Sequence, residues 1–360
     1  GILLFLPVLA WMVYVNYTVD PTGIFHGEQF AREAVELLLQ GQAVANYDAL
    51  ENKTRTINEA LILNSERFDT IVIGSSRAML INADVLGTTG SFLNMGVIGG
   101  DFQDLYGSFY LCVRENKVPS TVVLCIDPWT LNYNEVDFRS IEDWYLSFTS
   151  VYLGTDHTDY TPVKTAAKWQ VLLDPAYFQG AIAYQNRDQS GEMKPVAVAP
   201  EELYEQTTTV KLPDGTIIYD EEFRNQSPES VESIAAMVAK NYDSLCFRID
   251  KWEGPSAFAQ NEFARYIDYM IERDIRVVLV LTPYHPTVYD ALEEHADVLP
   301  GPANTQAFLY ELAARKGIEI YGSYNPYECE VDGTAFHDHF HMRQEALMEL
   351  LAPMRQHVYE

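Results

Sequence analysis

The chain has 360 residues, 48% of them apolar, so it can bury one large core or two smaller ones. Its 24 basic residues stand against 52 acidic ones, which gives a formal net charge of −28. This charge argues against a nucleic-acid partner and against broad attraction to anionic lipid headgroups, because proteins bind both of these anionic partners through clusters of lysine and arginine. The 4 cysteines follow no metal-binding spacing, and their pairing stays open.

The first stretch, residues 1–19, is largely apolar and uncharged, and it predicts a single-pass membrane anchor whose start precedes Gly1. A bilayer span needs about 20 apolar residues, and Trp11, Tyr14 and Tyr17 suit the boundary between lipid and water. We expect everything after this anchor to lie outside the cytoplasm. A cleaved signal peptide and a buried N-terminal helix are the alternatives, although no small-x-small cleavage site follows.

Residues 20–65 carry apolar side chains at helical spacing and predict a helical stalk or cover. Short β-branched and apolar runs then predict buried strands at 68–74, 91–97, 120–127, 276–282 and 318–321. Helical patterns follow at 101–115, 257–273, 303–315 and 343–356. Strands that alternate with helices predict an α/β fold, here a three-layer sandwich around a central, mostly parallel sheet.

The stretch 133–250 differs from the rest of the chain in its sequence pattern, because aromatic and polar residues mix in it without a strong helical or strand period. One hairpin-like stretch at 210–219 carries an Asp-Gly turn. We expect 133–250 to be an insertion that shapes a substrate surface. The α/β domain is expected to comprise 66–132 and 251–360.

Polar and aromatic residues follow the predicted strands at the sheet edge where functional residues of parallel sheets gather. They are Ser75 and Ser76, Asn94 and Gly96, Asp127 and Trp129, and His285. A loop before the last predicted helix adds Asp338 and His341. A serine becomes a nucleophile when a base lies within hydrogen-bond reach and an anion orients that base. The chain order Ser…Asp…His is one of several in which such triads occur.

Two other interpretations of these residues stay open. Ser76 could only cap the short helix that begins near Arg77, although we expect Ser75 to be the cap and Ser76 the nucleophile. The alternating histidines at 337, 339 and 341 could converge on a metal with Asp338 nearby. The Asp-x-x-His spacing explains the motif without a metal, so we expect none. No glycine-rich phosphate loop or full dinucleotide motif is present, and we expect no cofactor.

Three motifs resemble ordered blocks of the SGNH, or GDSL-like, hydrolase superfamily, which has a flavodoxin-like α/β fold. They are Gly74-Ser75-Ser76, Asn94-x-Gly96-x-x-Gly99 and Asp338-x-x-His341. The resemblance covers roughly residues 66–132 and 255–355. It implies that Ser76 is the nucleophile, His341 its base and Asp338 the residue that orients the base. It also implies that the backbone N–H groups of Ser76 and Gly96 stabilise an oxyanion, with Asn94 as a further donor.

The third block of this superfamily, Gly-x-Asn-Asp, is replaced here by Cys125-Ile126-Asp127-Pro128-Trp129. In this respect the chain is similar to a membrane-anchored branch that includes the teichoic acid D-alanine transfer protein and alginate O-acetylation proteins. The resemblance implies extracytoplasmic acyl transfer, of acetyl type, onto a cell-surface glycan or teichoic-type polymer. It also implies a membrane-bound O-acyltransferase (MBOAT) as partner. A tethered carbohydrate esterase with the same triad and a non-catalytic assembly subunit are the alternatives.

Further residues near the predicted site are candidates for substrate binding: Arg77, Asp127, Trp129, His285 and His339. Each also has a structural interpretation. Arg77 could pair with Asp127, Trp129 could belong to the core, and His285 could position its loop.

Overall fold

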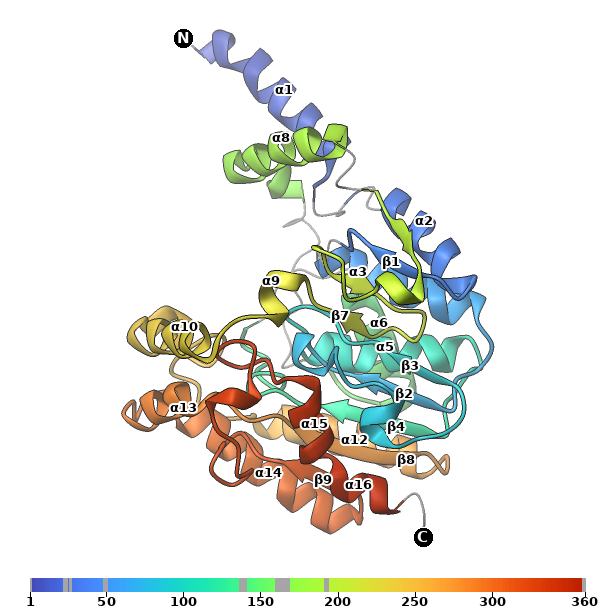
Figure 1. Ribbon diagram of the computed structural model, residues 1–360, viewed down its shortest axis with the longest axis vertical. Helices are drawn as coiled ribbons and strands as arrows, with labels where there is room; N and C mark the ends of the chain where they lie inside the picture. Colours follow the sequence, from blue (N-terminus) through green and yellow to red (C-terminus); the bar gives the residue numbers. More distant parts are fainter. Residues whose placement is uncertain are drawn as a thin grey trace.

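The computed structural model describes residues 2–21, 25, 28–47, 51–135, 141–158, 169–190 and 194–357. A five-stranded sheet forms its centre, in the order β3-β2-β4-β8-β9 (Figure 1). Its strands are β2 (Thr70–Ile73), β3 (Phe92–Asn94), β4 (Thr121–Cys125), β8 (Arg276–Leu281) and β9 (Glu319–Gly322). All neighbouring strands in it are parallel, which confirms the predicted α/β class and parallel sheet.

The strands form at the predicted runs because continuous β-branched segments suit a sheet that is covered on both faces. Every residue of β2 is buried, and so are the residues of β4 from Val122 onward. The register pairs Ile73 with Leu124 and Leu124 with Leu279. The strands therefore end at one common edge of the sheet.

Helices on both faces complete a three-layer arrangement. On one face lie α5 (Phe102–Arg114), α12 (Ala257–Ile271) and α14 (Pro300–Lys316), joined by ring contacts between Tyr106 and Tyr266 and between Phe263 and Phe308. The other face carries α4 (Ala83–Leu86), with α15 (Gln344–Leu350) and α16 (Ala352–His357) packed on it. The chain steps from β2 to β3 in one direction and from β3 to β4 in the other, so right-handed crossovers put α4 and α5 on opposite faces.

The segment before β2 covers the domain. Its helices are α2 (Glu28–Leu39) and α3 (Glu51–Asn64), and α3 packs on α5. Arg55 of α3 forms a buried ion pair with Asp104 of α5, with Nε 2.5 Å from Oδ1. Between the helices lies an unpredicted strand, β1 (Ala43–Ala45).

A small antiparallel sheet has the strand order β5-β1-β6-β7. Its other strands are β5 (Val196–Val198), β6 (Val210–Lys211) and β7 (Ile217–Ile218). The strands β6 and β7 form the predicted hairpin. Its turn touches the main sheet, because the backbone N–H of Asn94 donates to the carbonyl of Asp214 at 2.7 Å.

The remaining helical elements lie mostly in the 133–250 region. They are α6 (Glu142–Phe148), a π-helical turn η2 (Thr149–Leu153), η3 (Val171–Leu173), α8 (Pro175–Ser190), η4 (Pro200–Glu202), α9 (Glu221–Arg224), α10 (Pro228–Lys240), α11 (Tyr242–Leu245) and α13 (Pro286–Glu293). The 4 cysteines are all free thiols.

The N-terminal segment forms a helix, α1 (Ile2–Val19), which projects from the body beside α8 (Figure 1). Within the described ranges, no helix combines the length and the apolar character that crossing a bilayer requires. The prediction of a transmembrane helix over residues 1–19 is therefore not supported.

Candidate active site

The serine turn follows β2 directly. Ser76 begins a short helix, η1 (Ser76–Ala78), and the Ser75 hydroxyl caps it by accepting the backbone N–H of Arg77 at 3.2 Å. Gly74 leaves no room for a side chain, because a Cβ there would lie 2.6 Å from the Cβ of Cys125. The close approach of β2 to β4 therefore requires glycine at position 74. Ser76 lies at the carboxyl edge of the sheet, and its hydroxyl does not cap the helix.

The three residues predicted as a triad meet at this edge. The Ser76 Oγ lies 2.8 Å from Nε2 of His341, and Nδ1 of His341 lies 2.7 Å from Oδ2 of Asp338. Ser76 and His341 are half-buried, whereas Asp338 is buried. The hydrogen-bonded chain thus runs from a buried carboxylate to a hydroxyl that solvent or substrate can reach.

Asp338 also holds its own loop. Its Oδ1 accepts the backbone N–H groups of Phe340 at 2.9 Å and of His341 at 2.8 Å. Burial by itself would raise the pKa of Asp338, but contact with His341 and these hydrogen bonds outweigh burial and hold the pKa well below its ordinary value. An ionised Asp338 favours the tautomer with the proton on Nδ1 of His341, which leaves the lone pair of Nε2 directed at Ser76.

Backbone bonds close the loop that carries the pair. The N–H of His337 donates to the carbonyl of His341 at 2.8 Å, and the N–H of Arg343 donates to the carbonyl of Ala335 at 2.7 Å. Phe336 at the base of the loop is fully buried. These contacts place His341 with little freedom of its backbone.

Arg77 joins the strand ends to this loop. Its guanidinium bonds Asp127 Oδ1 at 3.2 Å, the carbonyl of Phe340 at 3.2 Å, and the carbonyls of Thr282 and Pro283 at 2.6 Å each. The side chain is only 1% exposed. The structural interpretation is therefore confirmed, and Arg77 is not open to a substrate.

Asp127 and Trp129 are likewise buried beneath the site. Burial raises the pKa of Asp127, against the opposing effect of the Arg77 guanidinium. The indole N–H of Trp129 donates to the carbonyl of Gly100 at 3.2 Å, and its ring packs edge-on against Phe340. Both residues were predicted as candidates for substrate contact, and both instead support the loops around Ser76.

His285 is also buried, and its ring caps α13 by accepting the backbone N–H of Thr287 at Nδ1, 3.3 Å away. The backbone N–H of His285 donates to the carbonyl of His339 at 3.1 Å, so His285 positions the loop that carries Asp338 and His341. The His339 side chain keeps 22% of its surface exposed and packs edge-on against Phe340. Of the five predicted substrate-binding residues, His339 alone is partly open.

The predicted oxyanion donors need a correction. The N–H of Gly96 donates to Oδ1 of Asn94 at 2.7 Å, and Nδ2 of Asn94 donates to the carbonyls of Ala78 and Ile81 at 2.8 Å each. Asn94 therefore holds the serine turn in place. Among the described residues, the N–H of Ser76 has no acceptor, which leaves it open for an oxyanion.

The three alternating histidines do not share one environment. His341 bonds Ser76, while the ring of His337 lies 5.4 Å from that of Phe223 and 5.7 Å from that of Tyr219. In the described part of the chain, no group of three His, Cys, Asp or Glu side chains could hold a metal ion.

Two aromatic residues near His341 were not predicted. Tyr219 follows β7, Phe223 lies in α9, and each ring centre is 6.1 Å from that of His341. Phe223 is positioned by the cap of α9, where its N–H donates to Asp220 at 2.9 Å. No local pattern marks these residues, because the contact joins segments more than a hundred positions apart.

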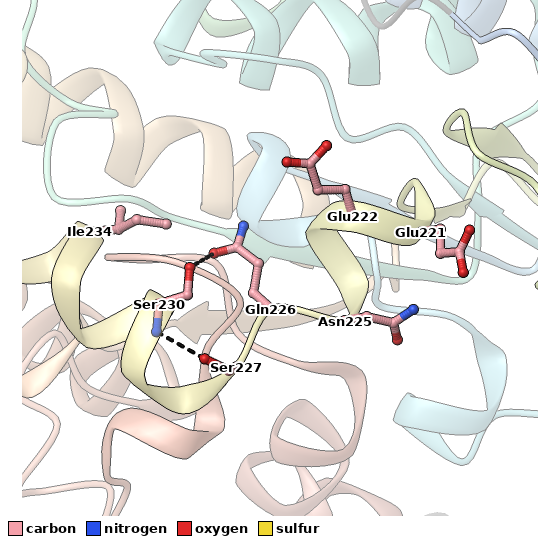
Figure 2. A pocket seen from close by; sticks show the side chains of 7 residues that line it. All are labelled: Glu221, Glu222, Asn225, Gln226, Ser227, Ser230 and Ile234. Carbon is pink, nitrogen blue, oxygen red and sulfur yellow. Dashed lines mark hydrogen bonds between the residues drawn. The ribbon is translucent and has the colours of Figure 1, made fainter.

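A polar hollow of about 590 Å³ lies between α9 and α10 (Figure 2). Its lining consists of hydroxyl, amide and carboxylate side chains with one aliphatic residue: Glu221, Glu222, Asn225, Gln226, Ser227, Ser230 and Ile234. This segment is held near the loop that carries Asp338 and His341, since Arg343 donates to the carbonyls of Arg224 and Gln226 at 3.1 and 3.3 Å.

Comparison with known proteins adds no relative: no protein-family model and no curated protein matches this chain. The interpretation of the site therefore depends on its motifs and its geometry.

Proposed function

We propose that this chain is a serine-dependent O-acyltransferase. The observation that carries the proposal is the hydrogen-bonded series from Ser76 through His341 to Asp338, with contacts of 2.8 and 2.7 Å at the carboxyl edge of the sheet. A nucleophile, its base and an orienting carboxylate in this order are the parts that acyl-serine chemistry needs.

In the first half-reaction, the Ser76 Oγ attacks the carbonyl carbon of an acyl ester and its proton passes to Nε2 of His341. The imidazolium is stabilised by the Asp338 carboxylate. The open N–H of Ser76 donates to the oxyanion, and such a donor contributes about 10²–10³ in rate. His341 then protonates the leaving oxygen, the ester bond breaks, and an acyl-serine remains.

In the second half-reaction, a hydroxyl of the acceptor gives its proton to His341 and attacks the acyl carbon. The bond between the acyl carbon and Ser76 Oγ then breaks, and His341 returns the proton to Oγ. A neutral, hydroxyl-rich glycan suits the polar hollow of Figure 2 and the net charge of −28 better than a polyanion does. From the resemblance we further propose an extracytoplasmic setting with an MBOAT protein as acyl source.

Esterase activity is the second candidate, because the same atoms serve when water is the acceptor. The 16% exposure of the His341 side chain favours it, since water can approach the base. The rings of Tyr219 and Phe223 beside His341 favour transfer, since they limit that approach.

Labelling with a fluorophosphonate followed by intact-mass analysis tests the nucleophile. We expect one adduct at Ser76, none in Ser76→Ala, and one adduct still formed, although more slowly, in the neighbour variant Ser75→Ala, which loses the cap of η1. A folded protein without an adduct would instead support the non-catalytic assembly subunit.

The acceptor is tested with an activated acetyl ester, with and without a neutral oligosaccharide. Transfer predicts acetylated sugar at the expense of free acetate. If acetate is released rapidly and adding the sugar does not lower its amount, the protein is an esterase.

A further inference from the structure

Another hollow, of about 220 Å³, lies at the carboxyl end of β9, where α13, α14 and the loop after β9 meet. Three tyrosines, two amides and one carboxylate contribute to its lining: Tyr289, Tyr310, Tyr324, Gln306, Asn325 and Glu328. The other lining residues are small or aliphatic, and among the residues that the structure describes no lysine, arginine or histidine lines it. We call it the tyrosine hollow.

The side chains of this lining are held in place by bonds within the protein. Gln306 of α14 accepts the backbone N–H of Tyr324 at 2.7 Å, and its Nε2 donates to Oε2 of Glu328 at 3.0 Å. The hydroxyl of Tyr310 donates to the carbonyl of Gly322 at 2.6 Å, while 39% of the residue stays exposed. A site whose side chains are already fixed loses less conformational entropy when a ligand binds.

Two polar groups of the tyrosine hollow keep unused hydrogen-bonding capacity. Oδ1 of Asn325 accepts the backbone N–H of Tyr327 at 2.9 Å, and in the described part of the chain its Nδ2 has no acceptor. Oε2 of Glu328 accepts from Ser323 at 2.6 Å and from Gln306, whereas none of the described residues donates to its Oε1. The hollow therefore offers one open donor and one open acceptor next to tyrosine rings.

This combination distinguishes the classes of ligand. A sugar ring carries C–H groups on its face, which pack on an aromatic ring, and hydroxyls on its rim, which need donors and acceptors. An anion finds no cationic partner in the lining, and the net charge of −28 opposes it. A cation can use Glu328 and the rings, but it leaves the Asn325 donor unused.

The size of the hollow sets a limit on the ligand. Pockets for drug-sized molecules have about 300–1,000 Å³, so a volume of about 220 Å³ suits one ring rather than a larger cofactor.

The tyrosine hollow and Ser76 lie at the same edge of the main sheet. Three strand spacings separate β2 from β9, which amounts to about 14 Å at about 4.8 Å each. Tyr324 connects the two places, because its hydroxyl donates to the carbonyl of Ile126 at 2.9 Å and its carbonyl accepts the N–H of Tyr284 at 3.1 Å. A chain of sugars that follows this edge can contact both.

We infer that the tyrosine hollow binds one sugar ring of a neutral glycan. Tyr310 supplies the ring for stacking, Asn325 the donor and Glu328 the acceptor. On a polymer, this contact holds the chain while another of its sugars lies at Ser76. That second role rests on the proposed acyl transfer, whereas the binding of a sugar ring does not.

Titration of the full chain by saturation-transfer difference NMR tests the inference with three neutral probes, maltotetraose, cellotetraose and chitotetraose. We expect at least one of them to bind. Tyr310→Ala should weaken its binding at least tenfold, because the stacking ring is lost. Asn325→Asp keeps the acceptor for the N–H of Tyr327 but loses the donor, and we expect about a tenfold loss.

The matched control is Tyr152→Ala, since Tyr152 is 42% exposed elsewhere on the protein and Tyr310 is 39% exposed. This control should bind the probe as the unmodified chain does. Circular dichroism shows whether each variant is folded, and Asn325→Asp provides the test if Tyr310→Ala is not. Equal binding by Tyr152→Ala, Tyr310→Ala and Asn325→Asp would overturn the placement of the site.

Tetramethylammonium serves as the probe for a cation. Binding of this ion that Asn325→Asp strengthens, without binding of any tetrasaccharide, would overturn the sugar in favour of a cation. No binding of any probe would overturn the site itself.

The outcome can be separated from that of the proposed function. Ser76→Ala should bind the tetrasaccharide normally, because Ser76 does not line the tyrosine hollow. A chain that binds sugar but takes no fluorophosphonate would refute the acyl-serine chemistry alone. A chain that is labelled at Ser76 but binds no sugar would refute the tyrosine hollow as a site.

Discussion

Asp338 performs two tasks with its two oxygens. One oxygen orients the His341 ring, and the other accepts two backbone N–H groups of the same loop. An amide side chain can retain the second task but not the first, because it presents N–H groups where the Nδ1–H of His341 needs an acceptor.

We therefore predict that Asp338→Asn keeps the fold and lowers the rate of acyl-serine formation by about 10³–10⁴, through the wrong imidazole tautomer. The rate of fluorophosphonate labelling measures it. The matched control is Asp332→Asn in the same loop, where the side chain caps the short helix η5 (Gly333–Ala335) by accepting the N–H of Thr334 at 2.8 Å. Asparagine caps equally well, so this control should label at the normal rate. Equal rates for both variants would refute the role of Asp338.

Burial lowers the pKa of His337 and of His339 to about 4 each. Unfolded histidine takes up a proton near pH 6.5, so between pH 6.5 and 4 the unfolded chain binds more protons than the folded one. The free energy of unfolding should therefore fall as the pH drops from 7 to 5, by on the order of 1–2 kcal/mol for each histidine.

Urea unfolding at several pH values measures this, and His337→Phe should flatten the decline because phenylalanine does not titrate. The depressed pKa of Asp338 acts only at lower pH, where the carboxylate is protonated and its contribution to stability is lost. An unchanged slope in His337→Phe would contradict the burial of a neutral ring.

The triad could be predicted from the sequence because its members carry local marks: a serine directly after a strand and an Asp-x-x-His spacing. For Arg77, the pair with Asp127 was among the sequence-based interpretations, but its bonds to the loop carbonyls could not be predicted. Its partners include backbone carbonyls of Thr282 and Phe340, and no residue type marks a carbonyl as an acceptor. The prediction of Asn94 as an oxyanion donor was wrong for the same reason, because its side-chain amide donates to backbone carbonyls of the serine turn.

At the level of elements, the central strands β2, β4 and β8 were predicted well because they are buried on both faces and their apolar runs are continuous. The strand β1 was missed, since its three residues lie between helices and pair with strands far along the chain. The helix α10 carries a readable signal, with Ser227 as cap, Pro228 in the first turn, and buried Val231, Ala235 and Val238 at helical spacing.

The segment from β7 to α9 places Tyr219 and Phe223 against the base. We predict that the double variant Tyr219→Ala and Phe223→Ala raises the ratio of hydrolysis to transfer severalfold, because water then reaches the acyl-serine more easily. Product analysis with the acetyl ester and the oligosaccharide measures this ratio independently of total activity.

Tyr204→Ala is the control, since this residue is 65% exposed and stacks on Arg224. An unchanged ratio in the double variant, with Ser76 still labelled, would show that these rings do not select the acceptor.

For the molecule as a whole, the hairpin turn at Gly215 joins the small sheet to the main one. Gly215 has φ of +81°, and a Cβ there would collide with the carbonyl oxygen of Asn94. We predict that Gly215→Ala costs about 2 kcal/mol or more in the free energy of unfolding and slows Ser76 labelling, since Asn94 supports the serine turn.

The matched control is Gly317→Ala, with φ of +65° and nothing within 4 Å of the added Cβ. It should cost only the backbone strain, about 1 kcal/mol, and leave labelling unchanged. Equal losses for the two variants in urea unfolding would mean that the hairpin turn does not support the site.

The neighbours β4 and β8 lie side by side in the sheet but are encoded far apart, from Thr121 to Cys125 and from Arg276 to Leu281. During synthesis the apolar β4 leaves the ribosome with an unpaired edge. This edge stays unpaired until the intervening segment and β8 have been synthesised. Pairing across so long a loop is slow, and open strand edges are prone to aggregate. The nascent chain should accordingly depend on chaperones until residue 281 has emerged.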